Sequence, residues 1–167
     1  MWGWKVLWLL LFPIALQTTV FSRLNFMGVV PDLVLIIIIC YGLLNGTNKG
    51  LFLGLIGGIL LDLTAGGILG INIITKALIG FCAGYLERMV FKDNLFVPIL
   101  SVLAGTIISE LLSFLILSAF GWRMGFFSFF FSILCPLCLY HIVLTGPIYI
   151  ILLKALNWYK HRKKVGA

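Results

Sequence analysis

Five ionisable side chains lie inside or at the ends of long apolar stretches: Asp32, Asp62, Lys76, Glu110 and His141. Where such a stretch crosses a bilayer, an aspartate or lysine at its centre costs about 2.5 to 3.5 kcal/mol. A chain keeps groups at that cost when they pair with one another, bind a partner or carry out a reaction. These five residues are therefore the first candidates for function.

Three of them, Asp32, Asp62 and Lys76, are predicted to lie toward the outer side of the membrane. Lys76 is roughly 12 Å below the outer end of its apolar run at 1.5 Å per residue, and its long stem can reach upward. Its ammonium can therefore pair with Asp62 or with Asp32. We favour an ion pair that packs and orients helices. The alternatives are a site for a ligand or an ion, and separate solvation of each charge at the interface.

Glu110 and His141 are predicted to lie at similar depth, near the middle of the membrane, on consecutive antiparallel helices. A hydrogen bond between the two side chains would neutralise both. We favour a structural tie between helices. The alternatives are contact with the transmembrane helix of a partner, and a proton relay, which would need a longer chain of such groups.

The sequence contains no H-E-x-x-H, P-loop or G-x-S-x-G motif, so the common signatures of metalloproteases, nucleotide-binding proteins and serine hydrolases are missing. We therefore expect a non-enzymatic protein with no catalytic residues, no cofactor and no metal. The basic residues lie at the ends of apolar runs and in a C-terminal tail, which indicates membrane topology rather than nucleic-acid binding.

The elements that must position these groups are membrane helices. The chain has 167 residues, of which 62% are hydrophobic and 10% are charged, and a span needs about 20 apolar residues. The predicted fold is an all-α polytopic membrane protein, a bundle of about six transmembrane helices in one domain at 1–157, with a short basic cytoplasmic tail at 158–167. The predicted spans are 4–21, 30–45, 50–64, 68–90, 95–120 and 126–156.

The run from Gly50 to Gly70 is rich in glycine, and we expect it to form the central helix of the bundle. Gly50, Gly54 and Gly58 recur at four-residue spacing, and in lipid such small residues let helix backbones approach closely. One helix earlier, Pro31 fits a first helical turn, where Asp32 would face the positive end of the helix dipole.

The distribution of lysine and arginine predicts the topology. With six spans, two basic residues, Arg23 and Arg123, lie on the outer side, and Lys76 lies in the membrane. The remaining nine lie on the side of both termini: Lys5, Lys49, Arg88, Lys92, Lys154, Lys160, Arg162, Lys163 and Lys164. Both termini are therefore expected to be cytoplasmic. Cleavage of the first helix, which would leave five spans, is the alternative.

One part of the chain, about residues 29–88, resembles the rod shape-determining protein MreD family. The features that carry the resemblance are the order and spacing of a few residues: Pro31-Asp32, then Gly50, Gly54, Gly58 and Leu61-Asp62, then Gly66, Gly67, Leu69 and Gly70. Beyond this part the chain is similar to the family in hydropathy, length and its basic C-terminus.

The resemblance implies a multi-pass subunit of the bacterial cell-elongation machinery in the cytoplasmic (inner) membrane. Proteins of this family associate with MreC, and through it with MreB, RodA and its penicillin-binding transpeptidase, and so support peptidoglycan synthesis. The resemblance implies no catalytic residues. On this basis we expect a membrane scaffold that recruits the transmembrane helix of MreC, either through a glycine-lined groove or through an uncovered apolar face.

The family is also similar in fold to the substrate-binding components of energy-coupling-factor vitamin transporters, which gives the alternative function. Such a component needs a polar pocket near its outer face. Asp32, Asp62 and Lys76 are the only candidates for that pocket, and the short outer loops offer few further hydrogen-bonding side chains.

Overall fold

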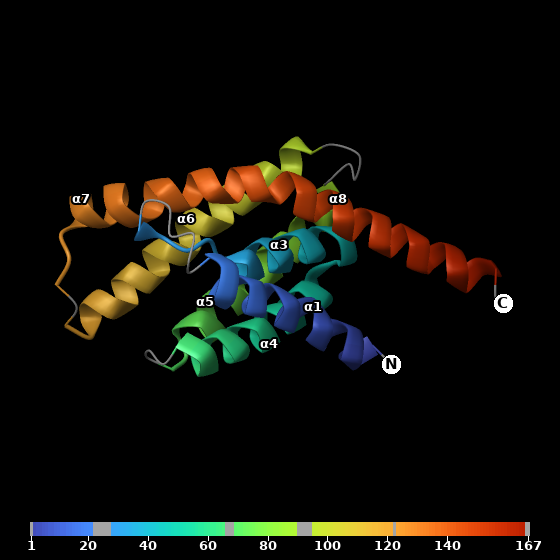
Figure 1. Cartoon of the computed structure of the whole chain (residues 1–167), viewed down its shortest axis with the longest axis horizontal. Helices are drawn as coiled ribbons and strands as arrows, with labels where there is room; N and C mark the ends of the chain where they lie inside the picture. The colour runs from blue at the N-terminus through green and yellow to red at the C-terminus, as the bar shows by residue number, and fades with distance from the viewer. Residues whose placement is uncertain (1, 22–27, 66–68, 90–94, 122, 166–167) are drawn as a thin grey trace.

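In the computed structural model, which describes residues 2–21, 28–65, 69–89, 95–121 and 123–165, these residues form helices and turns and no strand (Figure 1). The all-helical fold class is therefore confirmed. The elements are α1 (Trp2–Leu16) with the π-helical η1 (Gln17–Phe21), α3 (Leu33–Asn45), α4 (Thr47–Ala65), α5 (Ile71–Tyr85) with the 3₁₀ turn η3 (Leu86–Met89), α6 (Phe96–Ala119), and the continuous run of α7 (Phe126–Phe129), η4 (Phe130–Leu134) and α8 (Cys135–Val165).

The start of α3 differs from the prediction. Asp32 is the N-cap residue, so Pro31 precedes the cap rather than lying in the first helical turn. The other end of α3 meets α4 through Gly46 alone, whose φ of 90° is the left-handed conformation that glycine adopts without strain. This one-residue turn makes α4 begin at Thr47, three residues before the predicted start.

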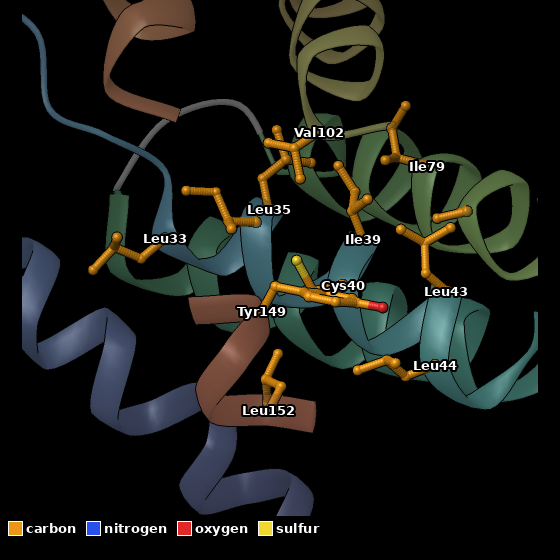
Figure 2. Packing of buried hydrophobic residues seen from close by; sticks show 12 residues of the cluster. Leu33, Leu35, Ile39, Cys40, Leu43, Leu44, Ile79, Val102, Tyr149 and Leu152 are labelled. Atoms are coloured by element: carbon orange, nitrogen blue, oxygen red, sulfur yellow. The ribbon is translucent and has the colours of Figure 1, made fainter. Parts of the chain in front are cut away.

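The central helix of the bundle is α3, not the glycine-rich α4 that we expected. Every residue from Leu33 to Leu44 is buried, because α3 packs against α1, α4, α5, α6 and α8. Figure 2 shows Leu35, Ile39 and Cys40 of α3 among side chains of α5, α6 and α8, including Val102 and Tyr149. A helix that is apolar on all sides belongs in the interior of a bundle.

The glycines of α4 lie where α4 meets α5. A Cβ atom on Gly58 would lie 2.6 Å from the Asn72 carbonyl oxygen, and one on Gly54 would collide with the Lys76 carbonyl. Likewise, Gly50 faces the carbonyl of Gly80. The two backbones touch, as the four-residue spacing predicts. Because α5 covers this stripe, it cannot form a glycine-lined groove for another protein, which corrects one of our two expectations for the partner site.

The α6 and α7–α8 helices form a long antiparallel pair whose joined ends reach beyond α3, α4 and α5 (Figure 1). Near these ends the ring of Phe114 lies 4.6 Å from that of Phe129 and 6.1 Å from that of Phe126. The π-helical segment η4 ends at Leu134, two residues before Pro136. Proline has no N–H to donate to the preceding turn, and a local change of helix type accommodates this loss.

The outer surface of the bundle is strongly apolar. Phe96–Ala119 and Phe126–Trp158 are long and apolar enough to cross a membrane, and Leu33–Asn45 and Ile71–Tyr85 are shorter apolar helices. Exposed large hydrophobic side chains occur on α1, α4, α5, α6, α7 and α8, and include Phe12, Phe52, Phe81, Phe127 and Val143. Soluble monomers rarely expose apolar surface on this scale, whereas lipid-facing helices do.

Candidate functional site

A buried ion pair joins the start of α3 to α5. The Lys76 ammonium lies 2.6 Å from Oδ2 of Asp32, and the two side chains are 3% and 16% exposed. The other carboxylate oxygen, Oδ1, accepts a hydrogen bond from the backbone N–H of Leu35 at 2.9 Å, so Asp32 also caps α3. Of the two partners considered for Lys76, the structure therefore selects Asp32 and not Asp62.

His141 connects the same helix start to α8 and α6. Its Nε2 accepts a hydrogen bond from the backbone N–H of Asp32 at 3.0 Å. Its Nδ1 lies 2.6 Å from the hydroxyl of Thr106, and that hydroxyl donates to the Val102 carbonyl at 2.7 Å. Because a backbone N–H can only donate, Nε2 must be unprotonated. The network therefore assigns a neutral ring with its proton on Nδ1.

The predicted hydrogen bond between Glu110 and His141 is absent, because Asp32 and Thr106 occupy both ring nitrogens of His141. Glu110 lies one helical turn beyond Thr106 on α6 and is partly buried. It is close enough to Lys76 and Asp32 for their charges to interact. Glu110 and His141 do lie at similar depth, about one helical turn apart, because His141 bonds to Thr106. The start of α3, however, lies beside His141 and takes one of its ring nitrogens.

The depth of Asp32 is a further correction. Its backbone meets His141, which is about 22 Å along the continuous run that begins at Phe126, at 1.5 Å per residue. The start of α3 is therefore deep within the bundle, and not at the outer surface as we expected. As a result, α3 is buried from its first residue, Leu33, to Leu44.

Asp62 performs a separate task at the end of α4. Its carboxylate accepts hydrogen bonds from the backbone N–H groups of Gly70 (2.8 Å), Asn72 (3.1 Å) and Ile73 (3.3 Å), and from Nδ2 of Asn72 (2.9 Å). These donors lie at the start of α5, so Asp62 satisfies a helix N-terminus and complements its dipole. Gly70 has a φ of 105°, which explains glycine at that turn. Gly66 and Gly67 lie outside the described residues.

With this geometry in hand, comparison with known proteins identifies the family. The family model for rod shape-determining protein MreD matches residues 2–158. The chain belongs to the MreD family. No curated protein and no solved structure matches it significantly.

Membership of the MreD family gives the site its context. The family determines rod shape, its members are membrane proteins, and it is a structural family not known to be enzymatic. Within the residues that the structure describes, no three His, Cys, Asp or Glu side chains converge as metal ligands. The cluster of Asp32, Lys76, Thr106 and His141, which we call the polar tie, links α3, α5, α6 and α8 of this MreD-family bundle.

Sequence reasoning missed Thr106. Its hydroxyl is fully buried and bridges α6 to α8, yet a threonine in an apolar run carries no charge to draw attention to it. Helical periodicity could have indicated it. Thr106 lies one turn from Glu110 and on the same face of α6 as Val102 and Gly105, which are buried, so its hydroxyl points toward the interior.

Proposed function

We propose that this protein is a non-enzymatic scaffold of the cell-elongation machinery in the bacterial cytoplasmic membrane. In this proposal it binds the transmembrane helix of MreC, and through MreC it supports MreB, RodA and the penicillin-binding transpeptidase during peptidoglycan synthesis. The observation that carries the proposal is the use of the ionisable groups. Asp32, Lys76, His141 and Asp62 all bond to neighbouring helices of this chain.

This use of the charges argues for structure rather than chemistry. A general base or nucleophile must reach a substrate with its reactive atom. Here Lys76 is bound to Asp32, and both nitrogens of His141 are engaged. A rigid bundle with an apolar outer surface is well suited to side-by-side contact with another membrane helix, where van der Waals packing supplies the attraction.

We also propose a six-span topology with both termini in the cytoplasm. The supporting evidence is the excess of basic residues on one side and the six separate helical segments among the described residues.

The transporter alternative has less support. A vitamin-binding pocket would require Asp32, Asp62 and Lys76 to face one space. Instead Asp32 and Lys76 pair in the interior, and Asp62 caps α5. These three side chains therefore do not form a shared binding site.

Affinity purification of the full chain from native membranes in mild detergent, read by mass spectrometry, tests the proposal. We expect enrichment of MreC together with RodA or its transpeptidase. Enrichment of a transport ATPase pair and its coupling membrane protein, without MreC, would overturn the scaffold function in favour of a transporter.

A further inference from the structure

Glu110 differs from the other ionisable groups of the interior in its hydrogen bonding. Among the residues that the structure describes, nothing donates a hydrogen bond to its carboxylate. Lys76 is the basic group within electrostatic range, but its ammonium is already bound to Asp32 at 2.6 Å. His141 is neutral and fully engaged. The carboxyl group of Glu110 therefore retains its capacity to accept hydrogen bonds.

The neighbouring residue supplies a second, independent observation. Ser109 is 1% exposed, and its hydroxyl has no hydrogen-bond partner within the described part of the chain. The buried threonine hydroxyls of the described residues bond to a carbonyl of their own helix: Thr75 to Ile71, Thr106 to Val102 and Thr145 to His141. Ser109, on the interior face of α6, does not. No polar group of the described chain therefore bonds to α6 at this level, even on its buried side.

The position of Glu110 on α6 explains why no donor of the described chain bonds to its carboxylate. Glu110 lies one turn beyond Thr106 along α6, within electrostatic range of Cys138 on α8. That level lies beyond Asp32, the N-cap residue at which α3 begins. Toward their joined ends, α6 and α7–α8 reach beyond α3, α4 and α5 (Figure 1). The central helix therefore cannot supply a donor to this part of the α6–α8 pair.

Depth determines which kind of molecule can supply the donor. Along α6, Glu110 is about 21 Å from Phe96 and about 14 Å from Ala119, at 1.5 Å per residue. Lipid head groups beyond either end of a spanning α6 are too distant, and hydrocarbon tails have no hydrogen-bond donors. A donor at this depth is best carried by another apolar helix, and polar side chains do join helices in membranes in this way.

We propose that Glu110, which is partly exposed, is the polar contact of this protein with the transmembrane helix of its partner. The partner helix lies against the part of α6 and α8 beyond Thr106, and presents a hydrogen-bond donor there: a hydroxyl, an amide or a basic side chain. This inference rests on the proposed function, because it assigns the contact to the MreC helix. It moves the partner site away from the glycine stripe of α4.

Photo-crosslinking in native membranes tests the contact. A photoreactive phenylalanine analogue replaces Ser113, which is partly exposed one turn beyond Glu110, in the full chain expressed with tagged MreC. The control position is Leu55, an exposed residue of α4 on a different face of the bundle, where the same analogue is placed. We expect the analogue at position 113 to crosslink to MreC, and the analogue at position 55 to crosslink much less.

Substitutions of Glu110 then test its hydrogen bond. We expect Glu110→Leu to lower the crosslink yield from position 113 by about three- to thirtyfold, the range for one interhelical hydrogen bond in a membrane. Glu110→Gln, which keeps an acceptor oxygen, should retain most of the yield. Amounts of protein in the membrane should match for both variants, since Glu110 bonds to nothing described in this chain.

Three results would overturn the inference. The first is an unchanged crosslink yield from position 113 in the Glu110→Leu variant. The second is a crosslink to MreC from position 55 that equals or exceeds the one from position 113. The second result does not depend on the Glu110→Leu variant accumulating in the membrane. In both cases, co-purification of MreC with the unsubstituted chain would leave the proposed function standing. The third result, absence of MreC from both crosslinking and co-purification, would overturn the proposed function as well.

Discussion

At the scale of single residues, the polar tie shows how a membrane bundle accommodates charge. Burying one charge is costly, whereas a pair with further hydrogen bonds offsets much of that cost. Asp32 receives the Lys76 ammonium on one oxygen and the Leu35 N–H on the other. Its own N–H is donated to His141. A single residue thus holds the start of α3 against α5 and α8.

Thr106→Val removes the hydroxyl that partners the ring of His141 while keeping a side chain of similar shape. The Nδ1–H group would then be buried without an acceptor, which costs about 1 to 3 kcal/mol. We expect a lower melting temperature of the purified protein in detergent. Thr106→Ser keeps the hydroxyl and is the control. Equal melting temperatures for the Val and Ser variants would show that the hydrogen bond does not matter for stability.

At the scale of elements, the join between α4 and α5 depends on small residues and on one cap. The glycines let the two backbones touch, and Asp62 closes the turn that follows. Both features were visible as sequence patterns, but their contacts were not. Four-residue spacing predicts that a helix packs closely without saying against which neighbour, and an aspartate at a helix end can cap the next helix or pair with a lysine.

Gly54→Ala should weaken this join. The added methyl group would collide with the backbone carbonyl of Lys76 and lie 2.9 Å from the Cα atom of Ala77, and overpacking of this kind costs about 1 to 3 kcal/mol. The matched control is Gly146→Ala in α8, where nothing lies within 4 Å of the added atom. We expect reduced accumulation and thermal stability for the first variant only. A Gly54→Ala protein as stable as the control would disprove the close contact.

Asp62→Ala should destabilise the start of α5, because the N–H groups of Gly70, Asn72 and Ile73 would lose their acceptor. Removal of a helix cap costs about 0.5 to 2 kcal/mol. Asp62→Asn retains one acceptor oxygen, so we expect its stability to lie between that of the unsubstituted protein and that of Asp62→Ala. The readout is again thermal unfolding in detergent. Rescue of Asp62→Ala by a further change at Lys76 would instead indicate that these two residues pair.

Some of the element boundaries could be read from the sequence and others could not. The ends of α6 at Phe96 and Ala119 lie close to the predicted limits of 95–120, because polar and glycine residues flank a clear apolar run. The start of α3 was misplaced. An apolar run does not reveal that its helix begins deep inside the bundle, since that depends on His141, more than a hundred residues away in sequence.

At the scale of the whole molecule, the bundle combines a fixed interior with an apolar exterior. The central helix α3 is covered on all sides, and the helices around it expose large hydrophobic side chains. The hydropathy of the chain predicted this membrane character. The pairing of the buried groups required the three-dimensional arrangement, because Lys76 could reach either aspartate from its position in the sequence.

We propose that the buried charges hold the bundle together and take no part in a reaction. The double substitution Asp32→Asn with Lys76→Met tests it, because asparagine keeps an acceptor for the cap of α3 while both charges are removed. Each single substitution leaves one charge buried without its partner, a loss of about 3 to 5 kcal/mol. Replacing both partners with uncharged groups is often close to neutral.

The most direct measurement is the shape of rod-forming cells in which each variant replaces the unsubstituted protein, alongside the amount of protein in the membrane. We predict that both single variants accumulate poorly and give rounded cells, and that the double variant restores both the protein level and the rod shape. A double variant that accumulates normally while the cells remain round would contradict the claim, because the charges would then be needed for more than structure.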